Sequence, residues 1–262
     1  MGVCNVTPDS FSDGGRYLDA EAARARVDEL MLEGADLIDV GGESTRPGAA
    51  PVPAREQLAR VLDVVAYAAG RGACVSVDTT SPEVAAATLD AGGCAVNDVS
   101  CLRDEGLAKV VGASGAALLL MHARGTQQDM RGFSEYPDDA YGDVVADVRR
   151  EWQAASERAV AAGVERAGLV MDPGLGFAKN ARQSLELLRR LDELTGTPVP
   201  VAVGASRKSF LTCVDPGATP AQRLGASLAA ALGAARRGAS ILRVHDVRAT
   251  AQAIDLDRLL EP

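Results

Sequence analysis

Short apolar runs recur along the whole chain, and almost every run stops at a polar or charged residue beside a glycine or proline. The run ends are Asn5, Asp39 to Glu43, Asp78, Asn97, Met121 with His122, Asp172, Gly204 to Lys208, and Arg243 with His245. Segments with helical spacing lie between them, for example at 20–32, 53–69, 82–91, 141–162, 184–194 and 220–236. Eight strand-then-helix units predict an α/β protein, a closed parallel (β/α)8 or TIM barrel, because parallel neighbours need crossover helices and eight strands can close a sheet. The polar run ends should then meet at the C-terminal ends of the strands, where such barrels carry their active sites.

The length and composition fit one such domain. The 262 residues match the roughly 250 typical of a single barrel, so we predict one domain over residues 1–262. The hydrophobic content of 47% includes only 3% aromatic residues, which predicts a core of Val, Leu, Ala and Ile. A formal charge of −9 argues against non-specific nucleic-acid binding, which relies on a basic face. An anionic ligand would therefore need a local cluster of cations and backbone N–H groups.

The sequence also bears on location and metal chemistry. No stretch approaches 18 apolar residues and no charged leader precedes an apolar segment, so we expect no membrane span, no signal peptide and a cytoplasmic location. The two histidines, His122 and His245, disfavour a His-rich zinc site. The cysteines are odd in number and lack CxxC spacing, so we expect buried reduced thiols rather than metal or redox sites. They are Cys4, Cys74, Cys94, Cys101 and Cys213.

The run 240–245 places two polar side chains at the end of the last predicted strand. Strand periodicity puts Arg243 and His245 on the same side, one pleat apart. Two hydrogen-bonding groups of this kind would converge on one spot. The alternative is an Arg and a His on a solvated rim. The apolar residues before them favour a buried strand, whose polar side chains need partners.

Three other strand ends offer hydrogen-bond acceptors. The runs before Asp78 and Asp172 end in an acid, and a carboxylate there can accept two hydrogen bonds from an amidine-like or guanidine-like heterocycle edge. Asn97 can both donate and accept, which suits a heterocycle with a mixed pattern. The alternative for each acid is helix capping, and Asp78 could serve the helix that follows Ser81 and Pro82.

Two loops suggest anion and carbonyl binding. The stretch 39–48 is rich in glycine and carries Arg46 near its tip, so the backbone can approach a ligand while Arg46 reaches a phosphate or carboxylate. The stretch 204–209 follows the seventh predicted strand, a place where barrels often bind phosphate or other polar groups. Lys208 there could hydrogen-bond a carbonyl or a ring nitrogen. Its alternative is a solvated lysine at a helix start, although cations are disfavoured at helix N-termini.

Taken together, these loops closely resemble those of the dihydropteroate synthase family of folate biosynthesis, the target of sulfonamides. The resemblance runs from end to end of the chain. The first and last motifs, the eleven-residue loop at 5–15 and the terminal RVHDV, are highly specific in combination. The matching stretches are 5–15, 39–48, Asn97 with Asp98, 172–179, 206–210 and 243–247.

The resemblance implies a transferase with Mg²⁺ as cofactor. Such an enzyme condenses (7,8-dihydropterin-6-yl)methyl diphosphate with 4-aminobenzoate, and the C–O bond breaks first to leave a pterin-methyl cation that the arylamine traps. It implies catalytic roles for Asp13, Arg46, Asp78 and Lys208. It implies pterin binding by Asp78, Asn97, Asp172 and Lys208. It implies diphosphate binding by Asn5, Thr45, Arg46, Arg243 and His245, with Asn5 also at the Mg²⁺ ion.

The resemblance also implies two loops that close over the substrates. They carry Phe11, Asp13, Thr45, Arg46 and Pro47, and their closure would exclude the water that otherwise traps the cation. A homodimer formed by helices late in the chain is expected as well. The aminobenzoate pocket would include Phe11, Thr45, Pro47, Phe177, Lys208 and Ser209.

Four positions depart from the family pattern, and none of them is a motif position for chemistry. Cys101 stands where glycine is common, Ser81 where lysine is frequent, and Gln127 and Asp129 alter a loop usually richer in proline and threonine. Two other functions share this fold. One is a pterin-binding paralogue without catalysis, and the other is a methyltransferase domain that passes a folate methyl group to a corrinoid. The loop 7–15 and the pair Arg243 and His245 favour the synthase.

Overall fold

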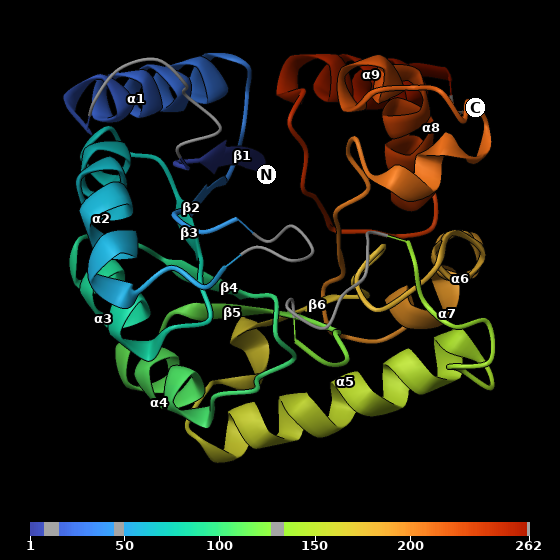
Figure 1. Cartoon of the computed structure of the whole chain (residues 1–262), viewed down its shortest axis with the longest axis horizontal. Coiled ribbons are helices and arrows are strands. Elements are labelled where there is room, and N and C mark those ends of the chain that lie inside the picture. The colour runs from blue at the N-terminus through green and yellow to red at the C-terminus, as the bar shows by residue number, and fades with distance from the viewer. Residues whose placement is uncertain (8–15, 45–49, 127–133, 261–262) are drawn as a thin grey trace.

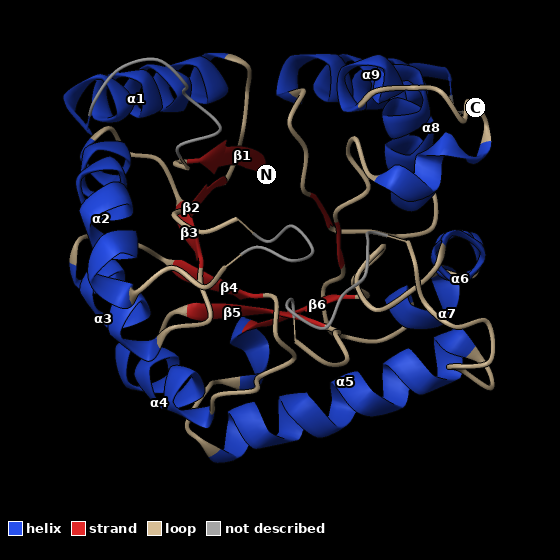
Figure 2. Ribbon diagram, viewed as in Figure 1, coloured by secondary structure: helices blue, strands red, loops and turns tan. Residues whose placement is uncertain are grey.

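The computed structural model of the chain describes residues 1–7, 16–44, 50–126 and 134–260. Within these ranges, eight short strands lie at the centre and helices form a ring around them (Figure 1). Figure 2 shows the same arrangement with the strands in red inside the blue helices. The strands are β1 (Gly2–Asn5), β2 (Ile38–Gly41), β3 (Val75–Asp78), β4 (Ala95–Asp98), β5 (Ala117–Met121), β6 (Leu169–Asp172), β7 (Ala202–Val203) and β8 (Ile241–Leu242).

The strands close into a barrel. Strands β1 to β6 form one parallel sheet and β7 pairs in parallel with β8. Parallel bridges join the two pieces at Met171 with Val201 and at Gly2 with Val244. At the second seam Val3 N donates to the Val244 carbonyl at 3.0 Å. The predicted (β/α)8 barrel is therefore confirmed.

The helices of the described residues follow the strands in turn. They are α1 (Arg16–Leu32), α2 (Ala54–Gly70), α3 (Pro82–Asp90), α4 (Glu105–Ser114), α5 (Val144–Ala161), α6 (Ala181–Arg189), α7 (Asp192–Thr195), α8 (Leu224–Ala235) and α9 (Val247–Leu260). The predicted helix 184–194 is two helices, α6 and α7. The predicted helix 220–236 begins with a 3₁₀ turn at Pro220–Arg223. Helices α4 and α9 were not among the segments named from the sequence, although eight strand-then-helix units were predicted.

The interior of the barrel changes from apolar to polar along its axis. Side chains on the outer face of the strands, such as Val40 and Val77, pack against the surrounding helices. At one level of the interior, Met1, Leu119 and Val170 belong to a small apolar cluster. Buried polar side chains lie toward the C-terminal strand ends, namely Asp39, Asp78, Asn97 and Asp172. The apolar cluster fills one level of the barrel, and the polar side chains line its C-terminal mouth, so a ligand-binding site is expected at that end.

The cysteines differ from the sequence prediction. Cys74 and Cys94, which precede β3 and β4, form a disulfide, so the expectation of reduced thiols is wrong for this pair. Parallel neighbours in the sheet bring the starts of β3 and β4 together, which the spacing along the chain does not reveal. Cys4 is buried as predicted, whereas Cys101 is half-buried and Cys213 is exposed.

Among the described residues, no helix is both long and apolar enough for a membrane crossing.

Candidate active site

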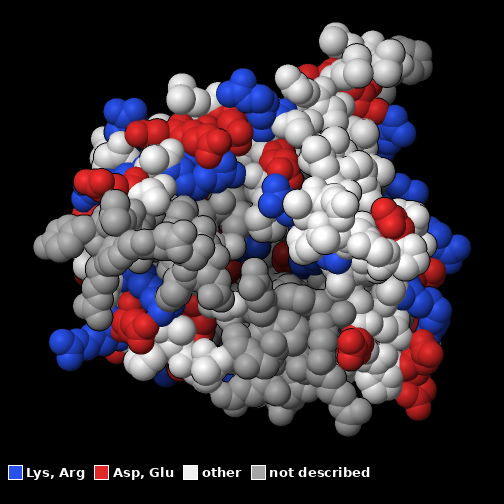
Figure 3. All heavy atoms as spheres, turned by 45° about the horizontal axis from the view of Figure 1, so that its top comes forward, with Lys and Arg blue, Asp and Glu red and all other residues white. Residues whose placement is uncertain are grey.

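Polar side chains from six strand ends meet at the C-terminal mouth of the barrel. The strand register sets Asn5 beside Gly41, Gly41 beside Asp78, and Asp78 beside Asn97. A Cβ on Gly41 would lie 3.6 Å from the Asn5 amide oxygen and 3.4 Å from the Asp78 Cβ. Figure 3 shows a hollow on this molecule in which acidic and basic side chains are visible. The convergence that the run ends predicted is therefore confirmed.

Arg243, directly after β8, lies between two buried acids. Its Nε donates to Asp39 Oδ2 at 2.6 Å and its Nη2 donates to Asp78 Oδ2 at 2.9 Å. Burial raises the pKa of Asp78 to about 7, against the opposing effect of Arg243. The alternative of a solvated rim is therefore wrong for Arg243. A guanidinium has five N–H donors, more than these two contacts use, so an anion can still be bound.

Asp39 is a site residue that sequence reasoning recorded as a run end and then left without a role. Its carboxylate is fully buried and accepts from Asn97 Nδ2 at 3.1 Å as well as from Arg243. Its second oxygen, Oδ1, has no hydrogen-bond partner within the described part of the chain. Asp39 therefore connects the ends of β4 and β8 beneath the mouth. Its position at the end of an apolar run, before two glycines, was the available signal.

Asp172 and Lys208 face each other across the mouth. Gly174 N donates to Asp172 Oδ1 at 2.7 Å. Burial raises the pKa of Asp172, and Lys208 is the largest opposing influence. Burial lowers the pKa of Lys208 to about 8, and Asp172 opposes that shift. Each of the two charges partly offsets the pKa shift that burial causes in the other. Such a pair suits a ligand that carries both donors and acceptors.

Lys208 turns inward rather than into solvent. Its Nζ donates to the Leu175 carbonyl at 2.6 Å and lies 4.7 Å from the centre of the Phe177 ring. A Cβ on Gly204 would be 3.7 Å from the Lys208 Nζ and 3.8 Å from the Arg243 Cβ. Gly204 thus leaves room for both cations. Lys208 does precede a 3₁₀ helix, Ser209–Cys213, but its ammonium is bonded inside the barrel mouth, so the alternative of a solvated lysine is wrong.

His245 joins the end of β8 to the loop after β7. Its Nδ1 lies 3.0 Å from Ser206 Oγ, and its carbonyl accepts from Arg26 Nη2 at 2.7 Å. Burial, followed by the charge of Arg243, lowers the pKa of His245 to about 4. The imidazole is therefore neutral near pH 7 and close to the arginine.

The capping alternative for Asp78 is also resolved. Helix α3 begins after Ser81, whose Oγ accepts from Val84 N at 3.4 Å. Asp78 instead accepts a hydrogen bond from Arg243 in the barrel mouth.

Cys101, one of the positions that depart from the family pattern, adopts a φ of 61°, a left-handed conformation that favours glycine.

The predicted aminobenzoate pocket is described only in part. Phe177 is buried in the loop after β6, and Ser209 Oγ lies 3.0 Å from Ser134 Oγ. The remaining predicted residues lie outside the described ranges. These residues are Phe11, Asp13, Thr45, Arg46 and Pro47, and the variant positions Gln127 and Asp129 are likewise not described.

The described residues hold no group of three or more His, Cys, Asp or Glu side chains that could chelate a metal by themselves. Asn5, at the end of β1, offers one amide oxygen beside Gly41. Mg²⁺ usually takes few protein ligands and completes its shell with waters and substrate phosphates. A single Asn ligand beside a diphosphate site is consistent with this coordination of Mg²⁺.

Comparisons with known proteins agree on one family. The family model described as "Pterin binding enzyme" matches residues 1–245. Dihydropteroate synthase of Mycobacterium leprae is 46% identical over 261 residues, covering 97% of this chain and 90% of that protein. A structure of Xanthomonas albilineans dihydropteroate synthase with 4-aminobenzoic acid has a TM-score of 0.90 at 42% identity, covering 100% and 93% of the two chains. Another structure of that enzyme, in complex with 7,8-dihydropteroate, has a TM-score of 0.87 at 40% identity, covering 100% and 94%.

Proposed function

We propose how the barrel mouth works in this chain, which belongs to the dihydropteroate synthase family of pterin-binding enzymes. The chain condenses (7,8-dihydropterin-6-yl)methyl diphosphate with 4-aminobenzoate, giving 7,8-dihydropteroate and diphosphate. The observation that carries the residue-level proposal is the set of buried polar side chains at one end of the barrel. The Asp39, Asp78 and Asp172 carboxylates, the Asn97 amide and the cations Lys208 and Arg243 lie together there.

In the proposal, Asp172, Asn97 and Lys208 bind the pterin. The Asp172 carboxylate accepts from the N–H groups of the amidine-like edge, and the Lys208 ammonium donates to a carbonyl or ring nitrogen. Burial raises the pKa of Asp172, and N–H donors supplied by a bound ligand would favour its charged form. Asp78 lies beside Asn97 in the register, where a carboxylate would stabilise positive charge that develops on the ring.

The leaving diphosphate belongs at the end of β8 in this scheme. Arg243 and His245 supply donors there, with Asn5 nearby at the end of β1. Charge on the departing oxygens would be stabilised without any nucleophile from the protein. Mg²⁺, when bound, would neutralise further diphosphate charge, and Asn5 is the residue proposed to hold it.

The loops after β1 and β2 complete the proposed site. Asp13 and Arg46 would close over the diphosphate, and Phe11, Thr45 and Pro47 would join Phe177, Lys208 and Ser209 around the aminobenzoate. Closure would exclude water from the pterin-methyl cation. Because the second pocket is built partly from closed loops, the substrates would bind in order, with the diphosphate ester first.

A homodimer is proposed through helices late in the chain. Exposed leucines lie there, with Leu224 on α8 and Leu256 and Leu259 on α9. Sedimentation with these leucines replaced by serine tests the assembly. The cytoplasmic location stays a prediction, which cell fractionation tests.

Diphosphate release tests the function. The purified chain is mixed with the pterin diphosphate, with 4-aminobenzoate, and with both, each with and without Mg²⁺. The synthase releases diphosphate only in the complete mixture and forms dihydropteroate in equal amount. A binding paralogue would release none, and a methyl-transferring domain would leave 4-aminobenzoate unchanged.

A further inference from the structure

A fully enclosed lysine lies behind the pterin site, outside the set of residues assigned to the substrates. Lys179 is 1% exposed, in the loop between β6 and α6. The chain has three lysines, Lys109, Lys179 and Lys208. Burying an ammonium is unfavourable unless hydrogen bonds replace its water, so the contacts of Lys179 indicate what its charge does.

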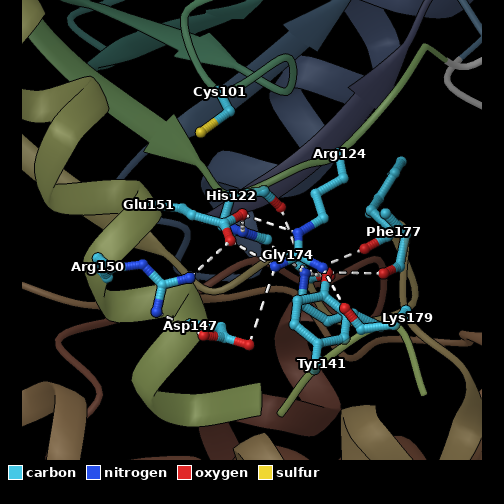
Figure 4. Close-up of polar contacts among 12 residues, drawn as sticks. Cys101, His122, Arg124, Tyr141, Asp147, Arg150, Glu151, Gly174, Phe177 and Lys179 are labelled. Carbon is cyan, nitrogen blue, oxygen red and sulfur yellow. Dashed lines mark hydrogen bonds and ion pairs between the residues drawn. The ribbon is translucent and has the colours of Figure 1, made fainter. Parts of the chain in front are cut away.

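The Lys179 ammonium is surrounded by acceptors from two loops (Figure 4). It lies 3.1 Å from the Gly174 carbonyl, 3.0 Å from the Phe177 carbonyl and 2.9 Å from His122 Nδ1. An ammonium has three donors and no acceptor, so these three nearest partners can use all of its donors; the His122 carbonyl lies farther away, at 3.5 Å. Burial lowers the pKa of Lys179 to about 7, and Asp172 opposes that shift.

A polar chain fixes the histidine that receives one of these bonds. His122 Nε2 lies 3.0 Å from Glu151 Oε2, and Arg124 Nε donates to the same oxygen at 2.8 Å. Burial lowers the pKa of His122 to about 4, so the ring is neutral near pH 7. The Nε2 hydrogen therefore points to Glu151, and the Nδ1 lone pair faces Lys179. Helix α5, which carries Glu151, is thereby connected to the loop.

The loop itself needs to be held. Gly174, Gly176 and Ala178 adopt positive φ values of 68°, 78° and 47°. A Cβ at Gly174 would lie 2.1 Å from the His122 carbonyl oxygen, so at Gly174 the backbones of the two loops are in direct contact. Ala178 adopts a conformation that is unfavourable for a residue with a Cβ. The carbonyl before it is bound by Lys179, and its own carbonyl accepts from the Tyr141 hydroxyl at 2.9 Å.

We infer that Lys179 is a positioning residue, whose buried ammonium fixes the β6–α6 loop against His122 and so sets Asp172 and Phe177 for the two substrates. Gly174 is the common element, because its carbonyl is bound by Lys179 and its N–H is bound by Asp172. Phe177 is bound through its carbonyl, and its ring lies by Lys208. This inference rests on the proposed assignments of Asp172 and Phe177.

The test compares Lys179→Met with Lys109→Met. Methionine keeps the unbranched length of lysine and removes the charge and donors, and Lys109 is an exposed lysine on α4. Without the ammonium, Asp172 and Phe177 should be less well aligned, at a cost similar to the free energy of one charge-assisted hydrogen bond. We therefore expect a rise of about tenfold in the KM for 4-aminobenzoate and in the Kd for the pterin diphosphate. The kcat at saturation should change by less than about threefold. Lys109→Met should leave all three values unchanged.

A purely structural role would lower the melting temperature but leave KM and kcat per folded molecule at wild-type values, and that result would overturn the inference. Tyr141→Phe supplies a second arm if Lys179→Met does not fold. It removes only the hydroxyl that holds Ala178, and a rise of about threefold in the KM for 4-aminobenzoate is expected for one neutral hydrogen bond. An unchanged KM in that variant would also count against the inference. Failure of the proposed function is distinguishable, because the wild-type chain would then release no diphosphate at all.

Discussion

Replacing Arg243 with alanine removes the cation that two buried carboxylates share. Asp39 lies 2.6 Å and Asp78 2.9 Å from the guanidinium, and the Asp39 side chain is 0% exposed. Breaking a buried pair by removing one partner costs about 3–5 kcal/mol. The Arg243 side chain is 22% exposed, so its removal would open a path for water to the two acids, and we expect the lower end, about 3 kcal/mol. That loss is below the total stability of a typical domain, about 5–15 kcal/mol, so the variant should fold.

The same change should also weaken diphosphate binding, by a free energy similar to the loss of stability. Losing a charge-assisted partner in a partly desolvated site costs about 2–5 kcal/mol, which corresponds to about thirtyfold to several thousandfold in Kd. A sulfonamide that occupies the aminobenzoate pocket should then no longer bind, although Arg243 is not expected to touch it. The reason is the proposed order, in which diphosphate closes the loops that form this pocket.

Two assays separate these effects. Calorimetry measures diphosphate binding with Mg²⁺ and sulfonamide binding with and without diphosphate, and urea unfolding measures stability. The double variant Arg243→Ala with Asp39→Asn removes one of the two uncompensated charges and leaves that of Asp78, so it should regain part of the stability and none of the diphosphate affinity. Arg24→Ala is the matched control, because Arg24 pairs with Asp63 in an exposed contact whose loss should cost less than about 1 kcal/mol.

Two results would refute the reasoning. Tight sulfonamide binding to the wild-type chain without diphosphate would contradict the binding order. Wild-type diphosphate affinity in Arg243→Ala would remove Arg243 from the anion site, whatever its effect on stability.

Three further predictions concern other parts of the site. Asp172→Asn should weaken pterin binding by about 1.5–3 kcal/mol, the value of a charged hydrogen bond, because the amide presents a donor to the pterin edge; unchanged affinity by calorimetry in a folded variant removes Asp172 from the site. Alanine at Asp13 or Arg46 should lower kcat and leave pterin affinity nearly intact, since both belong to the proposed closing loops; lost pterin affinity with normal turnover of bound substrate contradicts this. The free His245 has a pKa of about 4, and a bound diphosphate would raise it, so binding near pH 5–6 should take up a proton and tighten as the pH falls. Identical binding heats in buffers of different ionisation enthalpy would show no uptake.

The sequence predicted the barrel and its mouth because both depend on local pattern. An apolar run that ends in Asp78 or Asp172 reports a strand and its C-terminal end without any knowledge of partners. Helix α4, with 10 residues, was not named from the sequence, although the nine-residue helix α3 was. Helix α9 was not named either, and it begins at Val247, the last residue of the final motif.

The partners of these residues could not be predicted, because they depend on distant pairing. Arg243 and Asp39 are 204 residues apart, and only closure of the barrel brings them together. Lys179 and His122 are 57 residues apart, and nothing near Lys179 in the sequence distinguishes a buried ammonium from a surface one. The Cys74 and Cys94 disulfide has the same origin in strand pairing.

Isotope tracing of the condensation tests the central claim most directly. The pterin diphosphate is prepared with ¹⁸O in the oxygen that bridges the methylene carbon and phosphorus, and both products are analysed by mass spectrometry. The account predicts one dihydropteroate per diphosphate, with all the label in diphosphate, because the C–O bond breaks and the arylamine traps the carbon. Label retained in a hydroxymethylpterin, or diphosphate formed without dihydropteroate, would contradict it.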